Sequence, residues 1–140
     1  MTHLQMRSLI FIAALAGIGG PASAQQPSDV VNSNVNGDTA MGTNALVNLT
    51  NGELNTASEL GALQANTTGG YNSAMGYEAL YSNSDGSYNT ASAVQALYSN
   101  TSGISNTASG YYALLQNTTG GSNTADGSGA LGARLSVCVL

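Results

Sequence analysis

A 17-residue repeat fills most of this chain and limits what it can fold into. Its consensus is G-x-[YS]-N-[TS]-A-x-G-x-x-A-L-x-x-N-T-[TS], and its six copies follow one another without an insertion or a deletion. The copies begin at Val35, Gly52, Gly69, Gly86, Gly103 and Gly120. A period this strict indicates an architecture in which each copy is one structural unit and stacks on its neighbours.

Several repeat positions keep one residue type when the first residue of each copy is counted as position 1. Position 6 is always alanine, and positions 11 and 12 are always an Ala-Leu pair. Position 4 holds Asp38 and then Asn55, Asn72, Asn89, Asn106 and Asn123. Position 5 holds Thr39, Thr56, Ser73, Thr90, Thr107 and Thr124.

The repeat predicts an all-β fold, a parallel β-solenoid or β-roll of six 17-residue coils over residues 35–131. One copy is too short for a pair of helices, and its glycines and asparagines disfavour helix, although one short helical turn per coil stays open. Asn-Thr-Ala-x-Gly is expected to form a strand with Thr and Ala on opposite faces. Ala-Leu-x-x is expected to be a second strand or a tight corner. Asn-Thr-Thr-Gly is expected to turn, with Gly at positive φ and Asn bonding its own backbone.

The small conserved residues imply a narrow interior. A single copy has one leucine and two alanines to bury, so stacking must supply the core. We expect the core to consist of Ala57, Leu63, Ala74, Leu80, Ala91, Leu97, Ala108 and Leu114. Because this interior is thin for a monomer, the Leu or Tyr positions are alternatively expected to pack against sister chains.

The two ends of the chain differ from the repeat. Residues 1–24 look like a secretory signal peptide, with Arg7, an apolar run and the small residues before a cut after Ala24. An N-terminal membrane anchor is the alternative, but the apolar run is short for a span. Residues 25–34 are expected to be a linker. Residues 132–140 depart from the consensus, as either a crude cap or the sign of a truncated reading frame.

The charges exclude several classes of function. The only basic residues are Arg7 and Arg134, and the formal net charge is −5, which disfavours nucleic acid as a partner. Removal of the signal peptide takes away His3, the one histidine, and the acids are scattered, so no enzyme activity, metal site or cofactor is expected. The single cysteine, Cys138, cannot form an intramolecular disulfide.

Two columns of side chains are candidate binding surfaces. The threonines at position 5 (Thr39, Thr56, Thr90, Thr107 and Thr124) would form a ladder about 4.8 Å apart in a solenoid. Such a ladder suits ice binding, although threonine also simply favours strands. Tyr77 and Tyr111 share position 9 and would form a contact stripe for protein or glycan if exposed, or packing between chains if buried.

The stretch "NSAMGYEALYSNSDGSYNTA" resembles the head repeats of trimeric autotransporter adhesins (YadA-like heads), and is also similar to repeats of phage-type tail fibres. The resemblance covers residues 35–131. It implies a homotrimer that is exported to the cell surface or the medium and attaches to a host or surface protein or glycan. An ice-binding or other ligand-binding solenoid, and a truncated fragment without function, are the alternatives.

Overall fold

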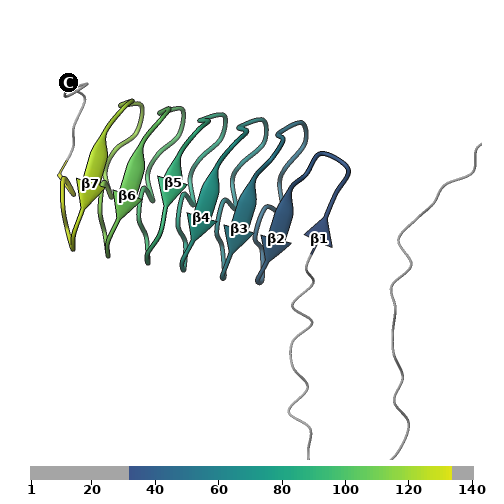
Figure 1. The fold of residues 1–140 in the computed structure, drawn as a ribbon, viewed down its shortest axis with the longest axis horizontal. Helices are drawn as coiled ribbons and strands as arrows, with labels where there is room; N and C mark the ends of the chain where they lie inside the picture. The colour runs from purple at the N-terminus through teal and green to yellow at the C-terminus, as the bar shows by residue number, and fades with distance from the viewer. Residues whose placement is uncertain (1–31, 134–140) are drawn as a thin grey trace, which may run out of the picture.

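The computed structural model describes residues 32–133, which form one β-solenoid (Figure 1). No helix occurs among these residues, so the short helical turn considered for each coil is replaced by hydrogen-bonded turns. The proposed signal peptide over 1–24, Cys138 and residues 134–140 lie outside the described part. The strands are β1 (Asn32–Ser33), β2 (Thr39–Met41), β3 (Thr56–Ser58), β4 (Ser73–Met75), β5 (Thr90–Ala91), β6 (Thr107–Ser109) and β7 (Thr124–Asp126).

The seven strands form a single sheet in sequence order. Strands β2 to β7 are parallel and pair residues one repeat apart, so that Ala57 lies between Ala40 and Ala74. Strand β1 is antiparallel to β2 and pairs Ser33 with Thr39. The segment 25–34, expected to be a linker, therefore ends in a strand that covers the N-terminal edge of the sheet.

Alternation along each short strand separates a buried face from an outward face. The position-6 alanines point inward and are buried, whereas the position-5 residues next to them point outward. The residues expected in the core are all at most 1% exposed: Ala57, Leu63, Ala74, Leu80, Ala91, Leu97, Ala108 and Leu114. The leucine column is thus buried within a single chain, which corrects the alternative that it packs against sister chains.

Buried asparagines link consecutive coils, a role that the sequence pattern did not reveal. At position 4, the backbone N–H and the Nδ2 of Asn89 both donate to Oδ1 of Asn72, at 3.0 and 3.2 Å. The same Nδ2 donates to the carbonyl of Gly103 at 2.8 Å. This pattern recurs from coil to coil, so the position-4 residues form a continuous amide ladder in which buried donors find acceptors.

A second ladder runs through position 15. Nδ2 of Asn100 donates to Oδ1 of Asn83 at 2.8 Å and to the carbonyl of its own turn residue Gly103 at 3.1 Å. The expectation that this asparagine bonds its own backbone is therefore confirmed, and the carbonyl of Gly103 accepts from both ladders. Within the described part of the chain, every fully buried side chain larger than alanine is a leucine or one of these asparagines.

The turn requires glycine at position 1 because no side chain fits there, and not because of the backbone conformation. A Cβ on Gly86 would lie 2.3 Å from Oδ1 of Asn83 and 2.5 Å from the carbonyl of Gly103 in the next coil. Gly86 does not have a positive φ, so the expectation that position 1 requires the left-handed region was wrong. The close approach lets that carbonyl reach both asparagine ladders, and only glycine permits it.

Positive φ values occur instead at positions 3 and 10 of the repeat and at the conserved leucines of position 12. Leu63 and Leu80 have φ values of 52° and 53°, and the N–H of Leu63 donates to the carbonyl of Ala79 at 3.0 Å. This conformation costs a non-glycine residue about 1–2 kcal/mol. Burial of a leucine stabilises by roughly 1.5–3 kcal/mol and offsets the cost. The Ala-Leu segment is therefore a tight corner, not a second strand.

We predict that Asn89→Ala destabilises the fold far more than Thr90→Ala. The first change removes bonds to Asn72, Gly103 and Asn106, whereas Thr90 is exposed on the outward face. The change orphans the buried backbone N–H of Asn106, while Asn72 Oδ1, the carbonyl of Gly103 and Nδ2 of Asn106 each keep one other hydrogen bond. One orphaned buried donor at about 1–3 kcal/mol and three further lost hydrogen bonds at about 0.5–1.5 kcal/mol each predict a loss of about 3–7 kcal/mol for Asn89→Ala. Urea unfolding measures both variants, and equal losses would contradict the role given to the ladder.

Candidate functional site

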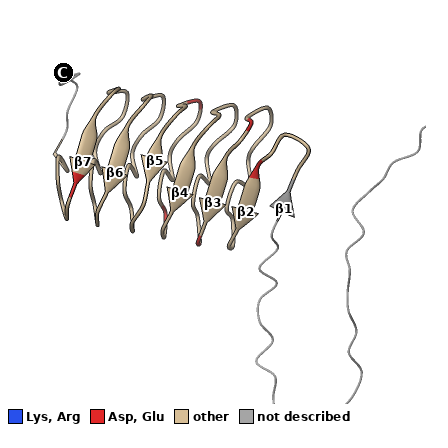
Figure 2. Cartoon of the chain, in the orientation of Figure 1, with Lys and Arg blue, Asp and Glu red and all other residues tan. Residues whose placement is uncertain are grey.

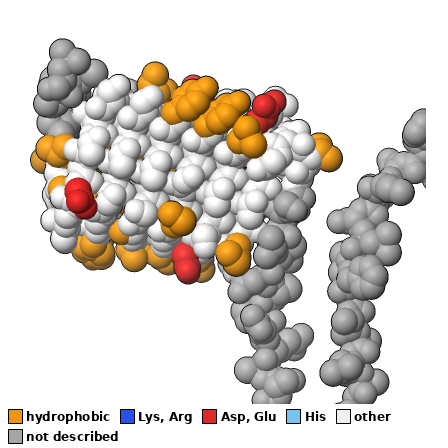
Figure 3. All heavy atoms as spheres, viewed as in Figure 1, with side chains coloured by type: hydrophobic (Ala, Val, Ile, Leu, Met, Phe, Trp, Pro, Cys, Tyr) orange, Lys and Arg blue, Asp and Glu red, His pale blue; other side chains and the backbone are white. Residues whose placement is uncertain are grey.

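The strand face, made by the outward position-5 side chains of β2 to β7, is regular and mostly polar. Parallel pairing places its members in register from coil to coil. Thr56, Thr90, Thr107 and Thr124 are exposed, while Thr39 is half-buried. Figure 3 shows few apolar side chains on this face. The structure thus brings the five predicted threonines together in one outward ladder, with Ser73 completing it.

Apolar side chains gather along the two edges of the strand face (Figure 3). The downstream edge follows the strands and consists of Leu60, Tyr77, Val94 and Tyr111. The upstream edge precedes the strands and consists of Leu54, Tyr71, Tyr88 and Ile104. All eight side chains are exposed, and Tyr77 and Tyr111 are 43% and 49% exposed. Contiguous exposed apolar residues on four consecutive coils are a feature of interaction surfaces.

Tyrosine rings stack along the solenoid. The rings of Tyr71 and Tyr88 are 4.9 Å apart between centroids, with an interplanar angle of 11°. The half-buried Tyr81 and Tyr98 stack in the same way at 5.1 Å. Because such contacts form within one chain, stacking between neighbouring coils holds these rings in fixed orientations.

The downstream edge carries an acidic group beside its tyrosines. Nε2 of Gln95 donates to Oε2 of Glu78 at 2.6 Å, which fixes the carboxylate between two coils. Hydrogen bonding to Glu78, and then its charge, raise the pKa of Tyr77 above the ordinary value. The pKa of Tyr98 is raised first by burial and then by the same carboxylate. Hydrogen bonding to Tyr112 raises the pKa of Tyr111. These phenols stay neutral donors well into alkaline solution.

The described residues carry acidic side chains but no lysine or arginine (Figure 2). The acids are scattered along the coils, and within residues 32–133 no group of three or more metal-ligating side chains lies together. The same part of the chain contains no helix that is long and apolar enough to cross a membrane.

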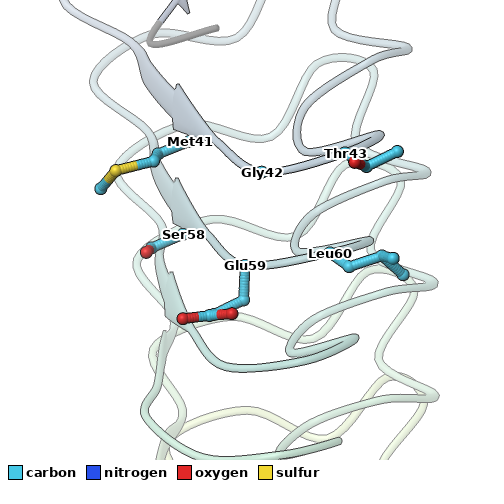
Figure 4. Close-up of a pocket in the computed structure, with 6 residues that line it drawn as sticks. All are labelled: Met41, Gly42, Thr43, Ser58, Glu59 and Leu60. Atoms are coloured by element: carbon cyan, nitrogen blue, oxygen red, sulfur yellow. The ribbon is translucent and has the colours of Figure 1, made fainter. Parts of the chain in front are cut away.

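A shallow pocket of about 320 Å³ lies between the first two coils. Its lining residues are Met41, Gly42, Thr43, Ser58, Glu59 and Leu60 (Figure 4). Met41 and Ser58 extend to one side of the coil, whereas Thr43 and Leu60 extend to the other. Since these side chains do not converge, the pocket presents no set of polar groups aimed at one ligand.

In the upstream edge, Tyr71 and Tyr88 share position 3, which the consensus gives as Tyr or Ser, whereas Leu54 and Ile104 were not anticipated from the sequence. Leu54 departs from the consensus at position 3, and Ile104 falls at position 2, where residue types vary between copies. A search for runs of large apolar residues one repeat apart would have found Leu54, Tyr71 and Tyr88.

No family model matches this chain, and no curated protein or solved structure matches it either.

We predict that Glu78→Gln lowers the pKa of Tyr77 toward the ordinary value of 10.0, because the acceptor charge beside the phenol is removed. The pKa of Tyr98 should fall by less, since burial is its larger cause. Ring-carbon NMR titration measures both. Asp85→Asn is the matched control and should leave both values unchanged; an unchanged Tyr77 in Glu78→Gln would refute the assignment.

Proposed function

We propose that this chain is an exported structural repeat protein of the adhesin-head or fibre type, which attaches to a surface through its downstream edge. The observation that carries the proposal is the exposure of Leu60, Tyr77, Val94 and Tyr111 on four consecutive coils. Together they form a periodic apolar and aromatic stripe on a scaffold whose interior is closed.

The properties of this stripe favour binding over chemistry. Tyrosine offers a large and rigid contact area with a polar tip, and such residues are enriched among those that dominate binding energy. The coil-to-coil hydrogen bonds hold the stripe on a regular backbone, as in the bonds from Gly61 to Thr43 and from Gln95 to Tyr77. A repeating stripe suits a partner that is itself extended, such as a glycan chain or the surface of a host protein.

A homotrimer belongs to this proposal, and the buried leucines restrict how it could form. Since each chain fills its own interior, sister chains would meet through outer side chains. We assign that role to the upstream edge, with Leu54, Tyr71, Tyr88 and Ile104. The downstream edge would then remain open to the target. Export, with cleavage after Ala24, is a further part of the proposal.

The test compares two tyrosine pairs on opposite edges. Purified chain is applied to a glycan array and to immobilised host-surface proteins, with the double variant Tyr77→Ala/Tyr111→Ala beside it. We expect the double variant to bind its best target at least about tenfold more weakly, because hot-spot truncation costs on the order of 1–2 kcal/mol or more.

The matched control is Tyr71→Ala/Tyr88→Ala, which removes two exposed tyrosines from the upstream edge. This control should keep target binding and instead lower the oligomer mass in light scattering. Equal loss of binding in both double variants, or no target for the unmodified chain, would contradict the proposed role of the downstream edge.

A second candidate function is ice binding by the strand face. The supporting observation is the in-register outward ladder of Thr39, Thr56, Thr90, Thr107 and Thr124, which repeats at the strand spacing of about 4.8 Å. Uncharged hydroxyl and methyl groups at a fixed repeat could match ordered water. Met41 and Met75 also stand outward on this sheet and interrupt its flatness.

If this candidate is correct, Thr90→Tyr should abolish the shaping of ice crystals by the purified chain, because a bulky ring in mid-ladder breaks the flat surface. Tyr77→Ala lies off the strand face and should retain the activity. The measurement is crystal morphology during slow cooling, and crystals that grow as in buffer alone with the unmodified chain would rule the candidate out.

A further inference from the structure

Two exposed tyrosines at position 3 of the repeat form a stacked pair that spans two coils. The ring centroids of Tyr71 and Tyr88 lie 4.9 Å apart, and the rings are nearly parallel, with an interplanar angle of 11°. Both residues have a φ of 60°, so the backbone presents the two side chains in the same way. The N–H of Tyr88 donates to the carbonyl of Gly70 at 3.0 Å. The hydrogen-bonded coils therefore hold the two rings against each other.

The pair has no further tyrosine along its own column. Position 3 holds Leu54 in the preceding coil and Ser105 in the following coil, and both share the positive φ of the pair. Tyr71 and Tyr88 are 49% and 60% exposed, so solvent reaches both rings. In this column each phenol thus has one phenol neighbour, which is the other member of the pair.

Two phenols held in this way are suited to oxidative coupling. Loss of one electron and the hydroxyl proton turns a tyrosine into a phenoxyl radical, whose unpaired spin is shared with the Cε carbons beside the oxygen. Two such radicals join through a bond between one Cε of each ring, and each of these carbons then passes its hydrogen to the phenol oxygen as aromaticity returns. Hydrogen peroxide, activated by a haem peroxidase, takes up the two electrons and two protons and leaves as two molecules of water.

Such a bond would supply a covalent link between coils. Residues 35–131 contain no cysteine, so no disulfide can do this within the repeat. The bond would close a loop of one 17-residue repeat, which restricts the unfolded chain as a disulfide does. Because each coil of a solenoid contacts only its neighbours, the link would join two stacked halves, each with three copies of the repeat.

The other stacked tyrosines are less suited to this reaction. Tyr81 and Tyr98 stack at 5.1 Å across the same two coils but are half-buried. Burial, and then the charge of Glu78, raise the pKa of Tyr98, which makes the loss of its proton harder. Tyr111 and Tyr112 are neighbours in the sequence, so a bond between them would join no coils. The structure therefore favours the exposed pair at position 3.

We propose that Tyr71 and Tyr88 are a site of oxidative modification, at which hydrogen peroxide and a peroxidase form a dityrosine bond between Cε carbons of neighbouring coils. The reaction needs only the single folded chain, in which both rings are exposed, so it does not rest on the surface attachment proposed above. The modification makes the joint between the third and fourth copies of the repeat covalent.

Peptide mapping of the oxidised full chain tests the proposal. The purified chain is treated with a haem peroxidase and hydrogen peroxide at low protein concentration and is then cleaved after Glu and Asp. Cleavage after Glu78 and Asp85 places Tyr71, Tyr81 and Tyr88 on three different peptides. We expect the first linked species to join the peptides of Tyr71 and Tyr88, with a mass lower than their sum by two hydrogen atoms.

Two phenylalanine variants assign the linked ring. Tyr71→Phe keeps a stacked ring but removes one phenol, so it should abolish this linked species. Tyr77→Phe is the matched control, because Tyr77 is 43% exposed and lies on the same peptide as Tyr71, and it should leave the species unchanged. A species that persists in Tyr71→Phe, a link between Tyr81 and Tyr98 that forms first, or links that form mainly between chains would overturn the proposal.

Thermal unfolding supplies a second readout. Oxidation should raise the unfolding midpoint of the original chain by about 10 °C or more, as expected for a covalent link that closes a loop of this length. The same treatment should leave the midpoint of Tyr71→Phe unchanged. An equal rise in both chains, or no rise in a chain that carries the mapped link, would contradict the role given to this bond.

Discussion

The hydrogen bond from one buried asparagine amide to the next is the interaction on which this solenoid depends. Each side chain is both donor and acceptor, so the coil before and the coil after it satisfy its two ends. An apolar residue of similar size at position 4 or 15 would fill the space but remove one of the two donors to the carbonyl of the turn glycine and interrupt its ladder. The asparagines therefore set the spacing, the register and the tight turn at once.

This dependence explains why the core needs no aromatic residue. Two alanines and one leucine per coil are enough, because the rest of the interior is filled by hydrogen-bonded amides. The tyrosines are left for the outside, where they stack between coils and form the two edges. The chain thus separates the task of holding the fold from the task of presenting a surface, and the surface residues vary between coils while the interior does not.

The solenoid itself could be predicted from the sequence, and its energetics could not. The 17-residue period and the alternation of Thr39 with Ala40 were enough for parallel strands and for the inward alanines. The turn glycines were recognised, but for the wrong reason, because a clash with the carbonyl of a neighbouring coil is invisible in one copy. Leu63 in a left-handed conformation was equally unexpected, since local propensity argues against it and only stacking offsets its cost.

The exposed edges, too, could be predicted from the sequence only in part. Tyr77 and Tyr111 share a position and could be singled out from the repeat, whereas Leu54 and Ile104 occupy variable positions and emerge as neighbours only after the coil is closed. The end of the ladders is a property of the stack as a whole. Asn117 and Asn123 follow the consensus, and only the direction of the hydrogen bonds shows that their side-chain oxygens have no partner among residues 32–133.

Proton exchange at the side-chain amides of the interior asparagines tests the central claim most directly. The account predicts that the Nδ2 protons of Asn72, Asn83 and Asn89 exchange orders of magnitude more slowly than those of the exposed Asn36, because each interior amide is buried and bonded to the preceding coil. Exchange of the interior amides at the rate of Asn36, in a chain that is otherwise folded, would contradict it.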